Sequence, residues 1–100
     1  MKIYIAGPYT IGDVAFNVSQ AIYIGDKILE KGHIPFIPHL THFWHFKYPH
    51  LIDTWYKYDM EWLKVCDAIY RIPGTSAGAD DEIEEAKKLG LRIINDLNEI

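Results

Sequence analysis

The stretch GTSAGADDEIEEAKKLG, residues 74–90, decides the fold. It begins as a loop of small residues and continues as an amphipathic helix, with acids in its first turns, lysines near its end and Gly90 in place to stop it. Short apolar runs stand on both sides of it, Asp67–Ile72 before and Leu91–Ile94 after, and both are typical of strands. This part of the chain is therefore predicted to be a strand–helix–strand unit of a parallel sheet.

Glu82 is the one acid of this helix that does not point toward solvent in a helical projection. The other acids between Asp80 and Glu85 complement the helix dipole on a solvated face. A carboxylate on the core side of a helix costs free energy unless something uses it, so we expect a functional role for Glu82, with a tucked salt bridge as the alternative. The apolar arc in which Glu82 lies consists of Ala79, Ile83, Ala86, Leu89 and Gly90.

The rest of the chain continues the alternation of strands and helices. Lys2–Ala6 is expected to be a central strand, because it is apolar and rich in β-branched and aromatic residues, and the proline of Ile34–Ile37 predicts an edge strand. This order implies one domain over residues 1–100, an α/β fold whose four-stranded parallel sheet has the order 2-1-3-4 and helices on both faces. The remaining helices are expected over Asp13–Lys31 and from an N-cap at Asp53 to about Val65, and the tail Asn95–Ile100 as a polar turn, with a fifth short strand left open.

Composition narrows the class of protein. The chain has 100 residues and a formal net charge of −4, which gives no basic surface for a nucleic-acid polymer. Its single cysteine, Cys66, excludes an internal disulfide and suits a reducing cytoplasm. We expect a cytoplasmic protein without a signal peptide or a membrane partner, because no apolar run is long enough to span a bilayer. The glycine fingerprint of dinucleotide-binding proteins and the phosphate-loop lysine motif are both absent, and no cofactor is expected.

The segment from His39 to His50 combines histidines with aromatic residues, and we expect it to form a loop. Its histidines at 39, 42 and 45 suggest a metal site, but they lack the carboxylate or thiolate company of most metal sites, and no metal is expected. Two compatible interpretations stay open. The segment binds a planar ligand such as a nucleobase, or it forms an interface between copies of the chain. A homodimer or higher homo-oligomer is expected.

Asp59 is a second acid at a position where an apolar residue is expected. It lies one turn from Trp55 and one turn from Leu63, on the inner face of its predicted helix. A structural acid bonded to backbone or aromatic donors is the alternative to a functional one.

In the predicted sheet, the turn after the first strand and the loop before Glu82 meet at the carboxyl edge, where α/β proteins bind ligands. Two acids in one cleft suit glycoside chemistry, with one as nucleophile and the other handling protons.

Two loops at this edge supply the candidate binding residues. The turn after the first strand contains Gly7, Pro8 and Tyr9. The loop before the acidic helix contains Ser76 and Gly78, whose hydroxyl and amides could hold a phosphate or a hydroxyl group of a ligand. Ordinary helix capping is the alternative role for Ser76.

Three motifs together resemble the nucleoside 2-deoxyribosyltransferase-like superfamily, which includes the 2'-deoxynucleoside 5'-phosphate N-hydrolases. They are KIYIAGPYT at residues 2–10, DMEWL at residues 59–63 followed by Cys66-Asp67, and S-x-G-x-x-x-E-x-x-x-A from Ser76 to Ala86. The resemblance covers nearly the whole chain. It implies a flavodoxin-like three-layer fold, and cleavage or transfer at the N-glycosidic bond of a (deoxy)nucleoside or its 5'-monophosphate.

The resemblance also implies roles for individual residues. Glu82 falls on the nucleophilic glutamate of the superfamily, and Asp59 falls on the aspartate that assists at the sugar and base. Tyr4 falls on the tyrosine whose hydroxyl holds the nucleophile. The loop that binds the 5' end of the nucleotide corresponds to Ser76 and Gly78, and a base-pocket histidine lies near His39.

Two departures from the superfamily pattern bear on the substrate. Pro8 and Thr10 stand where the phosphate-binding hydrolases have a serine and an arginine, so the 5'-phosphate requirement stays open, with Arg71 or a neighbouring subunit as a substitute. The chain has no C-terminal extension of the kind with which transferases complete a neighbour's site, which favours hydrolysis over transfer. The alternative function is a non-catalytic nucleotide-binding module, a sensor or partner domain on the same fold.

Overall fold

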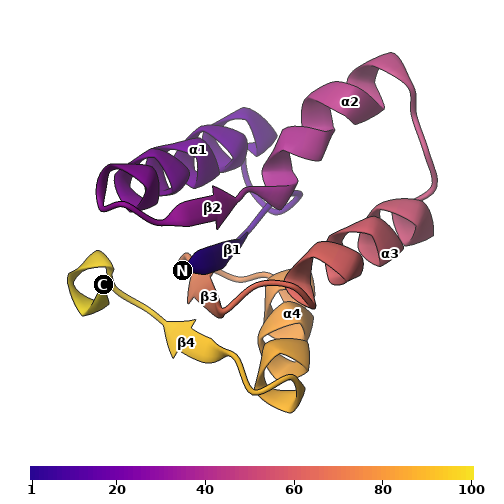
Figure 1. The fold of residues 1–100 in the computed structure, drawn as a ribbon. Helices are drawn as coiled ribbons and strands as arrows, with labels where there is room; N and C mark the ends of the chain where they lie inside the picture. Colours follow the sequence, from indigo (N-terminus) through magenta and orange to yellow (C-terminus); the bar gives the residue numbers. More distant parts are fainter.

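The sheet of the computed structural model, which describes residues 1–100, has four parallel strands in the order β2-β1-β3-β4 (Figure 1). The predicted order 2-1-3-4 is confirmed, and the sheet has no fifth strand. The strand that contains Pro35 lies at an edge, as the missing N–H of proline requires. The strands are β1 (Lys2–Ala6), β2 (Ile34–Phe36), β3 (Ala68–Arg71) and β4 (Arg92–Ile94).

Helices lie on both faces of this sheet, which confirms the three-layer, flavodoxin-like α/β class. Figure 1 shows the long first helix on one side and the third and fourth helices on the other. None of the helices has both the length and the apolar character needed to cross a membrane. The helices are α1 (Val14–Glu30), α2 (Thr41–Lys47), α3 (Ile52–Leu63) and α4 (Ala77–Lys88), with short 3₁₀ turns η1 (Pro38–Leu40) and η2 (Leu97–Glu99).

Alternate residues of β1 face opposite layers of the core, because successive side chains of a strand point to opposite sides. Ile3 and Ile5 pack on the α1 side. Tyr4 and Ala6 face the other side, toward α4 and the last turn of α3, and both are fully buried. Tyr4 therefore sits in the centre of the sheet, paired with Phe36 of β2 and Ile69 of β3 in register.

Two of the helices that flank the sheet, α1 and α4, begin with conventional side-chain caps. The Asp13 carboxylate accepts hydrogen bonds from the amides of Ala15 at 2.9 Å and Phe16 at 3.2 Å, which starts α1. The Ser76 hydroxyl accepts from the amide of Ala79 at 3.1 Å, which starts α4. Capping is thus one role of Ser76, as the sequence allowed. After the end of α4, Gly90 takes a positive φ of 76° as predicted for a terminating glycine.

The segment His39–His50 is not the loop that the sequence predicted, because most of it is helical. Thr41–Lys47 forms α2, which stops at Tyr48, since the residue before Pro49 disfavours helical backbone. No residue of α2 is buried. The segment therefore lacks the apolar face by which a helical period can be recognised in a sequence.

Two smaller predictions were also wrong. Asp53 does not cap α3, because Leu51 holds the capping position with extended backbone and no side-chain cap bond. Asp53 lies in the first turn instead, where its carboxylate pairs with Lys57 at 3.0 Å. Leu89 does not belong to the buried arc of α4; it follows the last helical residue and is 41% exposed.

Candidate active site

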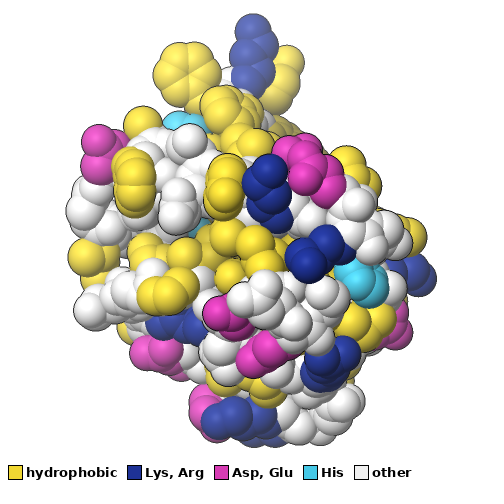
Figure 2. All heavy atoms as spheres, turned by 90° about the vertical axis from the view of Figure 1, so that its left-hand side faces the viewer, with side chains coloured by type: hydrophobic (Ala, Val, Ile, Leu, Met, Phe, Trp, Pro, Cys, Tyr) yellow, Lys and Arg dark blue, Asp and Glu magenta, His cyan; other side chains and the backbone are white.

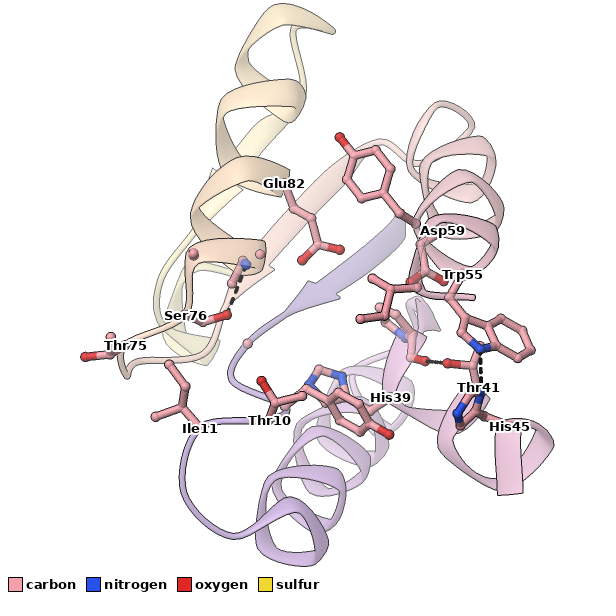
Figure 3. Close-up of a pocket in the computed structure, with 18 residues that line it drawn as sticks. Thr10, Ile11, His39, Thr41, His45, Trp55, Asp59, Thr75, Ser76 and Glu82 are labelled. Atoms are coloured by element: carbon pink, nitrogen blue, oxygen red, sulfur yellow. Dashed lines mark hydrogen bonds between the residues drawn. The ribbon is translucent and has the colours of Figure 1, made fainter. Parts of the chain in front are cut away.

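A cavity of about 600 Å³ opens at the carboxyl edge of the sheet, between the turn after β1, the loop before α4 and the α2–α3 hairpin, residues 41–63 (Figure 3). Gly7 lines it where β1 and β3 end side by side. A Cβ on Gly7 would lie 2.9 Å from the Cβ of Ile72, so only glycine lets these strand ends approach so closely. The convergence predicted from the strand order is therefore present.

Glu82 projects into this cavity from the second turn of α4 and is held by Tyr4. The Tyr4 hydroxyl donates a hydrogen bond to Oε2 of Glu82. Burial raises the pKa of Glu82 to about 7, the bond from Tyr4 acts in the opposite direction, and the charge of Asp59 raises it further. Burial also holds the pKa of Tyr4 well above its usual range, so Tyr4 stays a donor. The salt-bridge alternative is not met, because the hydrogen-bond partner of Glu82 is a neutral hydroxyl and no ion pair involves it.

Asp59 enters the same cavity from α3, on the opposite side from Glu82 (Figure 3). Burial raises the pKa of its carboxyl group to about 7. Its Oδ1 is buried and has no hydrogen-bond partner. A structural acid would bond to backbone or aromatic donors, so this orphaned oxygen weighs against the structural alternative.

His39 presents the second orphaned atom of the cavity. Its ring is almost fully buried, and its Nε2 lies 3.0 Å from the carbonyl oxygen of Pro8, which can only accept. The proton is therefore on Nε2, and burial lowers the pKa of the ring so that it stays neutral. Nδ1 keeps its lone pair and has no partner. His39 Nδ1 and Asp59 Oδ1 are the buried side-chain polar atoms without a partner, and both belong to residues that line this one cavity.

The remaining predicted binding residues divide between the cavity wall and its support. Gly7, Tyr9, Ser76 and Gly78 line the cavity, as does His39. Pro8 does not line it, and its contribution is the backbone carbonyl that fixes His39. The turn itself is fixed by Asn17, whose side-chain amide donates to the carbonyls of Tyr9 at 3.0 Å and Ile11 at 2.8 Å.

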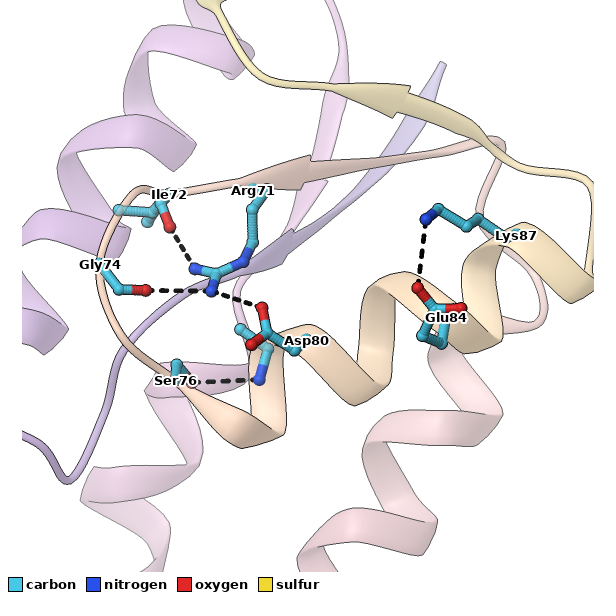
Figure 4. Close-up of polar contacts among 8 residues, drawn as sticks. Arg71, Ile72, Gly74, Ser76, Asp80, Glu84 and Lys87 are labelled. Carbon is cyan, nitrogen blue, oxygen red and sulfur yellow. Dashed lines mark hydrogen bonds and ion pairs between the residues drawn. The ribbon is translucent and has the colours of Figure 1, made fainter.

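Arg71 does not point into the cavity but braces the loop before α4 (Figure 4). Its guanidinium donates to the carbonyl oxygens of Ile72 and Gly74 and pairs with the Asp80 carboxylate at 2.9 Å. Three of its five N–H donors are therefore committed to the protein, and its charge is paired with Asp80. The eighteen lining residues contain no lysine and no arginine, so one copy of the chain offers no free cation to a phosphate group.

Comparison with known proteins assigns the chain to a family without a described activity. Residues 1–96 match the profile of the family described as Domain of unknown function (DUF7768). The chain belongs to this family. A solved structure of the 2-deoxyribosyltransferase from the psychrotolerant bacterium Bacillus psychrosaccharolyticus has a similar fold, with a TM-score of 0.71 over 93% of this chain and 69% of that chain, at 20% sequence identity. No curated protein matches the chain.

The three histidines that suggested a metal site are each engaged separately in this DUF7768 chain. His39 bonds to the Pro8 carbonyl, Nδ1 of His42 lies 2.7 Å from the Tyr9 hydroxyl, and Nδ1 of His45 accepts from Trp55. No group of three or more His, Cys, Asp or Glu side chains is placed to hold a metal ion. The three histidines are therefore individual hydrogen-bonding groups, of which His39 and His45 line the cavity and His42 does not.

Sequence reasoning missed several residues that line the cavity from the α2–α3 hairpin. Trp55 could have been found, because it lies one turn before Asp59 on the same face of α3. Ile52 and Tyr56 share that face, seven and three residues before Asp59, whereas no signal pointed to Thr41 or His45 as lining residues, since α2 itself was not predicted. The missed lining residues of this region are Thr41, His45, Ile52 and Tyr56.

Proposed function

We propose that this pocket binds a nucleoside and cleaves its N-glycosidic bond. The observation that carries the proposal is the pair of carboxyl groups, Glu82 and Asp59, which share one cavity and whose pKa values both rise to about 7. At neutral pH such a pair holds roughly one proton, which leaves one ionised nucleophile and one acid. The likeness in fold to a 2-deoxyribosyltransferase supports the same class of reaction.

In the proposed reaction, the Glu82 carboxylate attacks C1' of the sugar while the bond from C1' to the base nitrogen breaks. The electron pair of that bond goes to the base, which takes a proton from Asp59. Water then attacks C1' of the glycosyl ester, gives its proton to Asp59 and releases the sugar with retained configuration. Tyr4 orients Glu82 throughout, because its hydroxyl is fixed in the core of the sheet.

We further propose that an uncharged nucleoside is preferred over its 5'-monophosphate. The cavity contains two carboxyl groups and no lysine or free arginine, so a phosphate dianion would lose its hydration without gaining an opposite charge. The donors near the start of α4 are the hydroxyl of Ser76, which caps the helix as an acceptor, and backbone amides. These suit a 5'-hydroxyl group.

The direct test is a panel of ribonucleosides, deoxyribonucleosides and their 5'-monophosphates, with free base measured by chromatography. Base release is expected from nucleosides, more slowly from monophosphates, and from neither with the Glu82→Gln variant. Folded wild-type protein that released no base from any member of the panel would contradict the proposed activity. Faster release from monophosphates would contradict only the preference for uncharged substrates.

The second candidate is a module that binds a nucleoside without turning it over. The orphaned atoms of His39 and Asp59 support it equally, because a bound ligand would satisfy them whether or not it reacts. This candidate predicts that nucleosides raise the melting temperature of the wild type and of Glu82→Gln alike, with no base released by either.

We propose that a second copy of the chain covers the exposed apolar side of the α2–α3 hairpin. Phe46 is 87% exposed and Ile52, at the rim of the cavity, is 88% exposed. Figure 2 shows apolar side chains around a basic one projecting at the top of the molecule, where Figure 1 places the end of α2. Sedimentation at several concentrations is expected to show a dimer or larger assembly that Phe46→Ser weakens. The matched control is Phe16→Ser on α1, and a wild type that stays monomeric would contradict the proposal.

A further inference from the structure

His45 is held in one tautomer by two donors that meet at the same ring nitrogen. Its Nδ1 accepts the indole N–H of Trp55 at 2.8 Å and the backbone N–H of His50 at 3.1 Å. Both groups can only donate, so Nδ1 must carry the lone pair and the proton of the ring is on Nε2. His45 lines the cavity, and Figure 3 shows it below Trp55 on the α2–α3 side.

The N–H donors available to a ligand from side chains can be counted in this cavity. The lining residues include no lysine, arginine, asparagine or glutamine, so only His39, His45 and Trp55 carry such groups. The N–H of His39 is committed to the Pro8 carbonyl, and the N–H of Trp55 is committed to His45. Nε2–H of His45 is therefore the one side-chain N–H of the cavity without a protein acceptor.

We infer that His45 is a specificity-determining residue, whose Nε2–H donates to a ring nitrogen or carbonyl oxygen of the base, while the free Nδ1 of His39 accepts an N–H of the same base. The two histidines thus offer one fixed donor and one fixed acceptor, which is the complement of the one acceptor and one donor on the amide or amidine edge of a nucleobase. The inference rests on the proposed function in taking the ligand to be a nucleoside. The role of Trp55 is to hold the tautomer of His45.

The first experiment determines the tautomer of His45 and its contact with a free base, and it does not require turnover. In ¹⁵N-labelled wild-type protein, the histidine ring resonances are expected to show His45 protonated on Nε2 and bare on Nδ1. Titration with adenine, hypoxanthine, cytosine and thymine in turn is expected to shift the Nε2–H signal of His45 for at least one base. A ring protonated on Nδ1 would overturn the inference. So would a base that shifts the indole signal of Trp55 but leaves His45 unchanged.

The second experiment identifies the ligand atom that His45 contacts. Binding of adenine is compared with that of its 1-deaza, 3-deaza and 7-deaza analogues, each of which lacks one ring acceptor; for a pyrimidine-binding pocket, thymine is compared with its 4-thio analogue. One analogue is expected to bind about tenfold more weakly to the wild type, the loss typical of one hydrogen bond. The same analogue and its parent are expected to bind equally to His45→Leu. An equal penalty in both proteins would overturn the inference.

Matched variants separate the donor from the structural role of the ring. His45→Gln keeps an N–H donor and is expected to lie between the wild type and His45→Leu in base affinity and in KM, with kcat less affected. His33→Gln, which changes a histidine that bonds to the chain's amino terminus, serves as the control. Nucleoside turnover with a wild-type KM in His45→Leu would overturn the inference and leave the proposed function standing. Base binding with the expected His45 shift but no turnover would support the inference and contradict the hydrolase.

Discussion

The two walls of the pocket are held in different ways. On the wall formed by β1 and α4, the sheet wall, Glu82 is fixed by Tyr4 and flanked on α4 by Ala79 and Ala86, and these three neighbours are buried in the core. On the hairpin wall, residues 41–63, the only buried residue of the two helices is Leu63. The proposed nucleophile is therefore held by core residues, whereas the proposed acid stands on a helix at the margin of the core.

Aromatic contacts take the place of a core on the hairpin wall. Trp62 of α3 stacks on Phe36 of β2 with centroids 5.4 Å apart, and Trp44 meets Trp55 edge-on at 5.2 Å. Such pairs position a helix with far less burial than a core does. We therefore expect substitutions on the sheet wall to change the chemical step, and substitutions on the hairpin wall to change ligand binding or the proton supply.

The largest effect is expected from Glu82→Gln on the sheet wall. Loss of the nucleophile should lower kcat on the order of 10⁴-fold or more, with the fold retained, because the amide keeps the shape and can still accept from Tyr4. Single-turnover base release is the measurement. The control is Glu84→Gln on the same helix, whose side chain is exposed and pairs with Lys87. Comparable activity in the two variants would remove Glu82 from the mechanism.

The sheet wall was predictable from the sequence because its signals are local and periodic. The helical period placed Glu82 inside an apolar arc, the strand pattern placed Tyr4 in the central strand, and alternation of elements gave the strand order. Two parallel strands that end side by side then bring their loops to one edge. The bond between Tyr4 and Glu82 itself came only from the resemblance, since no pattern marks one strand tyrosine among several.

The hairpin wall was not predictable in the same way. The inner face of α3 did reveal Asp59, but α2 buries no residue, so its sequence carries no apolar period. The contact between His45 and Trp55 joins residues ten apart across the turn between α2 and α3, and only the geometry of that turn creates it. The capping signal at Asp53 was also misleading, because an acid in a first turn favours the helix dipole as much as a cap does.

Asp59→Asn tests the proton supply from the hairpin wall. An amide cannot give up a proton as a carboxylic acid does, so kcat should fall about 10³-fold. Since the pKa of Asp59 is about 7, the activity of the wild type should decline above that pH, and this alkaline limb should vanish in the variant. The rate profile from pH 5 to 9 checks both. Asp53→Asn on the same helix is the control, and an unchanged alkaline limb in Asp59→Asn would assign the acid elsewhere.

The free energy of unfolding should also depend on pH through Glu82 on the sheet wall. The folded protein raises the pKa of Glu82 from an ordinary 4.5 to about 7, so between these values it holds a proton that the unfolded chain has released. The free energy of unfolding contributed by this group is then fully present below about pH 4 and is lost as pH rises through 7, in total about 3 kcal/mol. Urea unfolding from pH 4.5 to 8 should show a shallower decline in Glu82→Gln. If the free energy of unfolding declined with pH equally steeply in the wild type and in the variant, the rise in the pKa of Glu82 through burial would be contradicted.

Tyr4→Phe is expected to have a smaller effect, because the ring keeps its packing beside Phe36, with centroids 5.5 Å apart, and only the hydroxyl is lost. One hydrogen bond to a carboxylate should be worth about tenfold in kcat. The hydroxyl lowers the pKa of Glu82, so its removal should move the acid limb of kcat/KM to higher pH. Tyr70→Phe is the control, since that ring packs in the other layer. If the acid limb of kcat/KM did not move in Tyr4→Phe, Tyr4 would not control the ionisation of Glu82.

The smallest effect is expected from Asp53→Ala on the hairpin wall, although its ion pair with Lys57 is short at 3.0 Å. Both side chains are largely exposed, at 69% and 75%, so solvent and salt screen the pair and the loss in unfolding free energy should not exceed about 0.5 kcal/mol. A double-mutant cycle with Lys57→Ala, measured by urea unfolding at low and high salt, gives the coupling directly. Because both residues belong to α3, a coupling above about 1 kcal/mol would mean that this charge pair contributes substantially to the helical state of α3 itself. The stability of the helix that carries Asp59 would then depend on ionic strength, whereas the contact of Glu82 with the fully buried Tyr4 would not.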